Sequence, residues 1–375
     1  MTRSTGKGEL YRQRVWGRSM RSMAGFAAFV AVGAALVGAA LVGGGPARAA
    51  CQLQQVGELP VVVTRGRILL PTSINGRPVM MIADTGAFTS LLSQDVPLEL
   101  GLSAHDFATT VRVDGVGGRV NARVVTIKEL RFGKFVVHDA KLMVAGRRLG
   151  PDAVVGLMGT DLFSQYDTEI DLPHGVVRLL KDSGCNDAQM PYWAKTYSEA
   201  PLEASPGLGS GFFTRLMLNG HAIEAQLDTG ASITTVTPGA ANAAGARPEA
   251  GAPVLQMRGV GPKAIDSEVY VFDTVGLGDE TVKNVRLLTA DMFRYNVEQE
   301  TGTRLGRETV GDIRALIGLD FFRSHHVLIS PSHHLIYFSY ESGEPFVAPT
   351  RRPPAPADAT PSSSAAVPAA PAPKP

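Results

Sequence analysis

The tetrapeptide Asp-Thr-Gly-Ala occurs twice in the chain, at Asp84–Ala87 and again at Asp228–Ala231. Two carboxyl groups that meet at one centre do not both ionise readily, so they share one proton over a useful pH range. The ionised group then takes a proton from a water molecule, and the protonated group donates to a carbonyl oxygen. The threonine hydroxyl can fix each turn by hydrogen bonding, and glycine allows the backbone to approach closely. The pattern therefore indicates acid–base chemistry at a carbonyl group, provided that the fold brings both aspartates together.

Further motifs repeat in the same order, which indicates a duplication. Ile74–Val79 recurs as Leu218–Ile223, and Gly115–Gly118 recurs as Gly259–Pro262, both with the same offset along the chain as the two aspartates. The segment Leu157–Phe163 recurs as Leu316–Phe322 with a larger offset. The second copy therefore holds about 15 additional residues, which we place in the polar stretch 294–314 as a surface loop.

Short β-rich runs surround these motifs and predict an all-β chain. Strands are expected to enter both Asp-Thr-Gly turns, and the Asn-Gly pairs at 75–76 and 219–220 predict hairpins. Helix is expected at 238–246, with Thr237 as its cap and Pro238 at its first position, and in a counterpart at 93–101. The domain organisation that we predict is an N-terminal lobe at 51–182, a linker at 183–207, a C-terminal lobe at 208–344 and a disordered Pro/Ala-rich tail at 345–375.

The series of motifs resembles one subunit of the retroviral-type, or retropepsin-like, aspartic peptidases. An Asp-Thr-Gly-Ala turn is followed by a glycine-rich segment and then by two apolar residues, glycine, any residue and aspartate. In that family two copies pair to build one active site, whereas here both copies belong to one chain, similar in logic to the pepsin-like enzymes. The resemblance implies two acid-protease β-barrel-like lobes with the active site between them, in a monomer that cleaves peptides or proteins.

The resemblance also implies a role for each repeated motif. Asp84 and Asp228 would be the catalytic pair, Thr85 and Thr229 would form a hydrogen-bonded lock between the lobes, and Gly86 and Gly230 would complete the turns. The flaps over the substrate would be Gly115, Val116, Gly117 and Gly118 in the first lobe and Gly259, Val260 and Gly261 in the second, where Pro262 replaces the last glycine. The segments 157–159 and 316–318 would pack beneath the turns, which leaves Asp161 and Asp320 as structural carboxylates.

Three functions remain open from the sequence. The first is an aspartic endopeptidase, the second is a catalytically silent peptide-binding module on the same fold, and the third is a membrane-anchored scaffold protein. The Asp-Thr-Gly segments could also be plain structural turns, and the glycine-rich segments plain hairpin turns. We expect no cofactor and no metal, because the pairs His325-His326 and His333-His334 flank one apolar strand and are best explained as residues of one hairpin.

The N-terminal part of the chain, residues 1–50, indicates export. Basic residues precede an apolar run at 24–42, and Ala47-Arg48-Ala49 follows as a candidate cleavage site of a signal peptide, with an uncleaved membrane anchor as the alternative. The body of the protein is then expected in the periplasm or outside the cell. In such a compartment Cys51 and Cys185 most simply form a disulfide, with two unpaired thiols as the alternative.

Composition excludes other classes of protein. The chain has 375 residues, 44% of them hydrophobic and 19% charged, with a formal net charge of +1. This composition is sufficient for a core and excludes a wholly disordered chain. The balanced charge excludes nucleic-acid binding through bulk positive charge.

Overall fold

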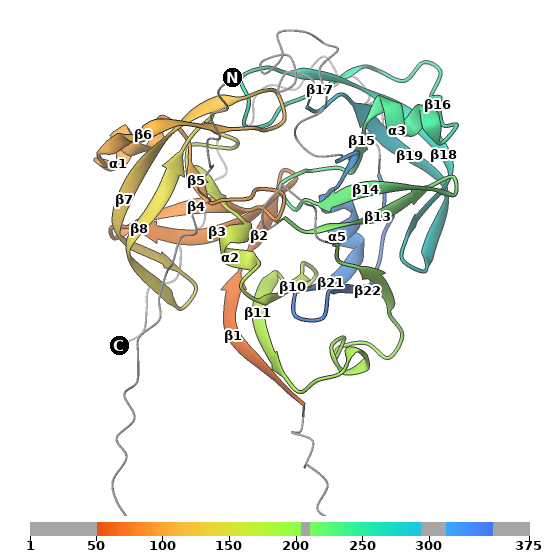
Figure 1. Cartoon of the computed structure of the whole chain (residues 1–375), viewed down its shortest axis with the longest axis horizontal. Helices are drawn as coiled ribbons and strands as arrows, with labels where there is room; N and C mark the ends of the chain where they lie inside the picture. The colour runs from red at the N-terminus through yellow and green to blue at the C-terminus, as the bar shows by residue number, and fades with distance from the viewer. Residues whose placement is uncertain (1–50, 204–210, 294–312, 348–375) are drawn as a thin grey trace, which may run out of the picture. The chain divides into compact units, whose positions relative to one another are not determined.

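The computed structural model describes residues 51–203, 211–293 and 313–347, and nearly all of their regular structure is β-strand (Figure 1). The all-β prediction is therefore confirmed. The helices of this part of the chain are short: α1 (Val96–Leu100), α2 (Thr160–Phe163), η1 (Asp187–Gln189), α3 (Pro238–Ala243) and α5 (Leu319–Ser324). Within the described residues no helix is both long and apolar enough to cross a membrane. The predicted export segment, most of the predicted insertion and most of the predicted tail lie outside the described residues.

The first half of the chain builds an eight-stranded sheet around the first Asp-Thr-Gly turn. Its strands, in spatial order, are β2 (Val62–Thr64), β3 (Arg67–Ile74), β4 (Arg77–Ala83), β9 (Val154–Met158), β5 (Leu91–Leu92), β8 (Phe135–Val144), β7 (Val120–Phe132) and β6 (Ala104–Val113). β3 also pairs with β7, so the sheet curls back on itself like a barrel. The β3–β4 hairpin turns at Asn75 and Gly76, which both have positive φ, as the Asn-Gly pair predicted.

The second half repeats this arrangement. Its sheet has the order β13 (Phe213–Leu218), β14 (His221–Leu227), β20 (Ala315–Ile317), β15 (Thr235–Val236), β19 (Glu280–Ala290), β18 (Ile265–Leu277) and β16 (Arg247–Pro248), and β17 (Leu255–Met257) pairs with β18. The β13–β14 hairpin turns at Asn219 and Gly220, again with positive φ. β13 also pairs with β18, in the same way as β3 pairs with β7.

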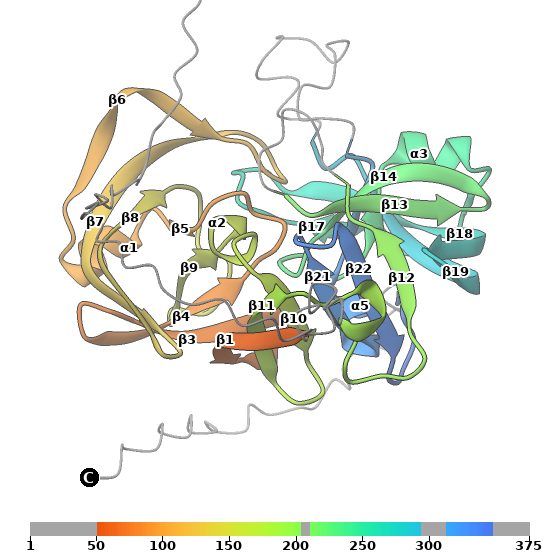
Figure 2. The same ribbon diagram turned by 60° about the horizontal axis from the view of Figure 1, so that its bottom comes forward.

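A third, six-stranded sheet joins the two halves. Its order is β1 (Gln52–Pro60), β11 (Val176–Ser183), β10 (Asp167–Asp171), β21 (His325–Ser330), β22 (Leu335–Tyr340) and β12 (Ser198–Pro201). β10 of the first half lies antiparallel to β21 of the second half, and the two strands appear side by side in Figure 2. β12 lies within the range expected to be a linker, so this range contributes a strand that pairs with β22. A disulfide between Cys51 and Cys185 joins the residue before β1 to the segment that follows β11.

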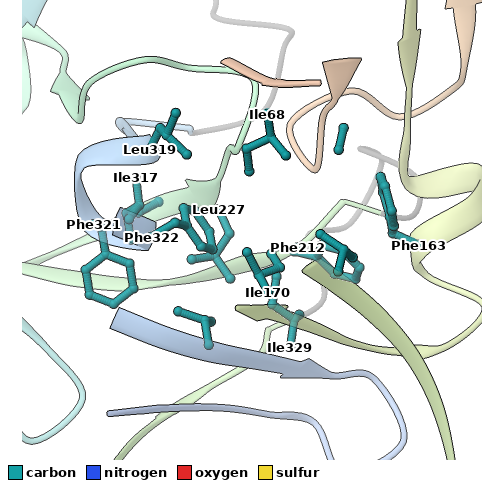
Figure 3. Packing of buried hydrophobic residues seen from close by; sticks show 14 of the residues in the cluster. Ile68, Phe163, Ile170, Phe212, Leu227, Ile317, Leu319, Phe321, Phe322 and Ile329 are labelled. Atoms are coloured by element: carbon teal, nitrogen blue, oxygen red, sulfur yellow. The ribbon is translucent and has the colours of Figure 1, made fainter. Parts of the chain in front are cut away.

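One hydrophobic cluster continues through both halves. It includes Ile68, Phe163 and Ile170 of the first half together with Leu227 and Ile317 of the second, and Figure 3 shows these side chains packed around one another. Because they are almost completely buried, the two halves cannot move apart without exposing this core to water. The turns that follow β4 and β14 are therefore held at a fixed position relative to each other.

The central sheet also buries a network of charged groups. Glu169 is fully buried and accepts hydrogen bonds from Arg178 Nη1 at 2.6 Å, Tyr192 Oη at 2.6 Å and His326 Nε2 at 2.9 Å. These partners hold the pKa of Glu169 below its usual value against the effect of burial. Glu169, Asp171 and His326 have the ligand types of a metal site, but Arg178 already contacts both carboxylates.

Candidate active site

Two parallel strand pairs place the repeated aspartates. β4 runs beside β9 and β14 runs beside β20, and each aspartate follows directly where its strand ends. The Asp84 amide donates to Met158 O and the Asp228 amide donates to Ile317 O, both at 2.9 Å. Because each apolar-apolar-glycine segment accepts this hydrogen bond, it holds the first residue of the turn beside it. The expected packing of 157–159 and 316–318 beneath the turns agrees with these contacts.

The two turns are joined by a reciprocal set of hydrogen bonds between Thr85 and Thr229. Thr85 Oγ1 accepts from the Thr229 amide at 3.0 Å and donates to Leu227 O at 2.9 Å. Thr229 Oγ1 accepts from the Thr85 amide at 3.0 Å and donates to Ala83 O at 2.7 Å. Both threonines are buried, so these four bonds form away from water and fix the position of one turn against the other.

The glycines of the turns make room for the opposite carboxyl group. A Cβ atom on Gly86 would overlap the carboxyl group of Asp228, and a Cβ atom on Gly230 would overlap that of Asp84. Neither glycine has positive φ. The requirement for glycine is therefore a steric one between the two halves, and it shows that Asp84 and Asp228 converge on one centre.

The two aspartates accept hydrogen bonds from backbone amides and have raised pKa values. Asp84 Oδ1 accepts from the amides of Gly86 and Ala87, both at 3.0 Å, and Asp228 Oδ1 accepts from the amide of Ala231 at 2.9 Å. Burial and repulsion by Asp228 raise the pKa of Asp84, and burial raises the pKa of Asp228. Both groups therefore hold a proton to higher pH than an exposed aspartate does.

A cavity of about 840 Å³ is lined by both aspartates and by residues of the two glycine-rich segments. Gly261 N donates to Val116 O and Lys263 N donates to Gly117 O, both at 3.0 Å, so the tips of the two segments touch. Gly117 has a φ of 92° and Gly118 one of 113°, which proline cannot adopt. Pro262 therefore gives the second segment a different backbone from the first. Apolar side chains line much of the wall: Leu91, Met143, Leu149, Leu157, Leu288 and Leu316.

Asp161 and Asp320 lie away from the cavity and support the turns. Asp161 accepts from the amide of Ser90 at 2.9 Å and from its hydroxyl at 2.7 Å. Asp320 accepts from the amide of Thr234 at 2.8 Å and from its hydroxyl at 2.7 Å. Burial raises the pKa of Asp320 to about 6. The two carboxylates thus make equivalent contacts in the two halves, as expected of structural residues.

The predicted histidine hairpin is formed by β21 and β22. Its first pair is buried, with His326 bound to Glu169 and with His325 Nε2 3.1 Å from Glu280 Oε1. His333 lies near the surface between Asp182 and Asp187. These histidines contact carboxylate groups and lie outside the lining of the cavity.

Sequence reasoning missed several polar residues that line the cavity, and two of them, Arg67 and Gln226, contact the Asp-Thr-Gly turns. Arg67, at the start of β3, lies close enough to both aspartates to lower their pKa values, which opposes the effect of burial. Gln226 donates from Nε2 to Gly86 O at 2.9 Å. Both positions could have been found by aligning the two copies, because their counterparts are Gly211 and Ile82, which are not polar.

A known protein family matches both halves of the chain. A family model described as aspartyl protease matches residues 70–162 and 214–321, one range in each half. Among solved structures, the crystal structure of an aspartic proteinase from Irpex lacteus is 13% identical, with a TM-score of 0.42, and the alignment covers 78% of this chain and 98% of that chain. No curated protein matches the chain.

Proposed function

The chain belongs to the aspartyl protease family, and we propose that it is an endopeptidase in which Asp84 and Asp228 activate one water molecule. The observation that carries this proposal is the convergence of the two carboxyl groups in a cavity that the two glycine-rich segments also line. A cavity of about 840 Å³ is large enough to hold several side chains of an extended peptide.

The chemistry follows from the shared proton. The ionised carboxylate takes a proton from the water while the protonated carboxyl donates to the oxygen of the scissile carbonyl, and the C–O bond forms. The resulting diol then collapses: its hydroxyl proton returns to a carboxylate, the C–N bond breaks and the leaving nitrogen takes a proton from the pair. The pair ends with one proton, as it began, and no covalent intermediate or metal is required.

The other repeated residues have supporting roles in this proposal. Thr85 and Thr229 hold the two aspartates at a fixed separation, Gly86 and Gly230 let them meet, and the flaps exclude water from the bound peptide. One chain supplies both aspartates, so the enzyme acts as a monomer. We place it outside the cytoplasm, in the periplasm or beyond, with residues 1–50 as signal peptide or anchor, and the disulfide supports that location.

The test is the digestion of a peptide library by the full-length chain and by the variants Asp84→Asn and Asp228→Asn. Each variant should lose cleavage by at least about a thousandfold, since each carboxyl group has a separate task. Asp279→Asn, the same change at an exposed turn residue, is the matched control and should keep full activity.

Two results would contradict the proposal. Cleavage that survives both substitutions would show that the aspartates are structural, and binding of peptides without any cleavage would support the peptide-binding module instead. Specific activity should also stay constant on dilution, whereas a steep loss would indicate an obligate oligomer.

A further inference from the structure

The two ends of the cavity differ, although the repeat makes them equivalent in position. Arg67 precedes Asp84 by the same number of positions as Gly211 precedes Asp228. Likewise Phe88 follows Asp84 at the same spacing as Ser232 follows Asp228. The same internal symmetry that brings Asp84 beside Asp228 therefore places Arg67 and Ser232 at one end of the cavity and their counterparts at the other.

The first end is polar and cationic. Arg67 reaches across to the second half, where its Nη1 donates to Gly230 O and, at 3.3 Å, to Ser232 Oγ. Ser232 Oγ donates in turn to Gly66 O at 2.9 Å, so both side chains are held in place. Arg67 is half-buried and lines the cavity, and no carboxylate of the described residues lies within ion-pair distance of its guanidinium. Its Nε and Nη2 donors make no hydrogen bond within that part of the chain.

The opposite end is aromatic. A Cβ atom on Gly211 would overlap the rings of Phe88 and Phe213, so glycine is what allows both rings to occupy the space that corresponds to the Arg67 end. The two ring centroids are 6.3 Å apart, and Phe88 lines the cavity. A half-buried arginine with unused donors thus faces a pair of phenyl rings on the other side of the aspartates.

We propose that this asymmetry sets substrate selection: Arg67 and Ser232 bind an acidic side chain on one side of the scissile bond, and Phe88 contacts an apolar side chain on the other. The inference rests on the proposed function in treating the cavity as a peptide site. Arginine presents several donors in a planar fork that matches a carboxylate, and such charge-assisted bonds are stronger than bonds between neutral groups. Because part of the fork is already fixed by Gly230 and Ser232, little side-chain entropy is lost on binding.

The test uses short labelled peptides that differ only in carrying Glu or Gln at one position, moved along either side of the scissile bond. Binding is measured by fluorescence anisotropy with full-length Asp84→Asn, so the result does not depend on turnover. At positions on one side of the bond we expect Glu to bind about tenfold more tightly than Gln. The additional substitution Arg67→Gln should reduce this ratio to below about twofold. Arg67→Lys should still favour the Glu peptide, but by a smaller ratio than the parent arginine.

The matched control is Arg123→Gln, which removes one exposed arginine of β7 outside the cavity lining and should leave the Glu/Gln ratio unchanged. Thermal unfolding of each variant shows whether it is folded, and Arg67→Lys keeps the test valid if Arg67→Gln does not fold. Equal binding of Glu and Gln peptides at every position, no binding of any peptide, or a ratio that persists in Arg67→Gln would overturn the proposal.

The cleavage assay separates this proposal from the endopeptidase proposal. With the unsubstituted chain, the Glu/Gln ratio of kcat/KM should follow the binding ratio. Selective binding of Glu peptides without cleavage would refute the endopeptidase and leave the acidic-peptide site standing. Cleavage with no preference for Glu would refute the acidic-peptide site and leave the endopeptidase proposal standing.

Discussion

The pH dependence of cleavage gives a sharp test of the environment around the two aspartates. The residues that follow the Asp-Thr-Gly turns are Ala87 and Ala231, whose amides donate to the carboxyl groups at 3.0 and 2.9 Å while their methyl side chains donate nothing. A hydroxyl at these positions would add a donor beside each carboxylate. The perturbation is therefore the double substitution Ala87→Ser and Ala231→Ser.

The direction of the expected shift in the pH profile follows from the raised pKa values of the two aspartates. Activity requires one proton on the pair, so the upper limb of the profile falls where that proton is lost. Burial of both carboxyl groups, together with repulsion of Asp84 by Asp228, raises the pH at which this proton is lost. We therefore expect the parent to work from mildly acid toward neutral pH. A hydrogen bond to a charged group contributes about 1.5–3 kcal/mol, and one pKa unit corresponds to about 1.4 kcal/mol. The net effect is smaller than this range allows, because the serine hydroxyl gives up hydrogen bonds to water. We therefore expect the upper limb of the profile to shift to lower pH by about one unit.

The assay is kcat/KM on one uncharged peptide across the range from about pH 3 to about pH 9, fitted to macroscopic constants of the pair. Each single serine substitution should give part of the shift. Arg67→Gln should move the upper limb the other way, because Arg67 lowers the pKa of both aspartates. A parent that works only at strongly acid pH, or serines that leave the upper limb in place, would refute the reasoning.

Three further predictions concern stability. Because folding raises the pKa of Asp84, the folded chain keeps a proton that the unfolded chain releases above about pH 4, so stability falls as pH rises toward the raised value. Asp84→Asn should therefore unfold at a higher temperature than the parent near pH 8, with a gain that shrinks toward pH 4; a gain independent of pH would contradict this. Thr85→Val removes two buried hydrogen bonds and should lower the free energy of unfolding in urea by about 2–4 kcal/mol. Thr85→Ser keeps the hydroxyl and should retain most of the parent's free energy of unfolding. Glu169→Ala leaves Arg178 and His326 without their shared buried partner and should lower the same quantity by about 3 kcal/mol; a loss below about 1 kcal/mol, the usual value for an exposed pair, would show that the network contributes little.

Local features of the fold followed from local chemistry. Thr237 caps α3 by accepting from the amide of Ala240, so the helix predicted at 238–246 begins where expected, although it already ends at Ala243. Its predicted counterpart at 93–101 is reduced to the five residues of α1, whose N-cap residue, Asp95, makes no side-chain capping bond. The beginning of α3 was predictable because a cap acts within one turn of the chain, whereas helix length depends on what the helix packs against.

Non-local pairing was beyond the reach of the sequence. The range 183–207 was expected to be a linker, yet β12 within it completes the central sheet by pairing with β22, a strand that follows the whole sheet of the second half in the chain. The same sheet pairs β10 with β21 across the two halves and buries Glu169 between them. Such contacts depend on where distant strands end up, and no short motif encodes them.

The sequence by itself determined the duplication, the two Asp-Thr-Gly turns and the Asn-Gly hairpins, because each is encoded by residue types within a few positions of one another. It also indicated that glycine was needed at 86 and 230, but only the tertiary structure gave the reason, which is the approach of a carboxyl group from the opposite half. Only the tertiary structure placed Arg67 beside the pair, since β3, a hairpin turn and β4 lie between Arg67 and Asp84 in the chain. The difference between the two ends of the cavity is likewise decided by packing across the halves, where Gly211 admits two phenyl rings and Arg67 meets Ser232.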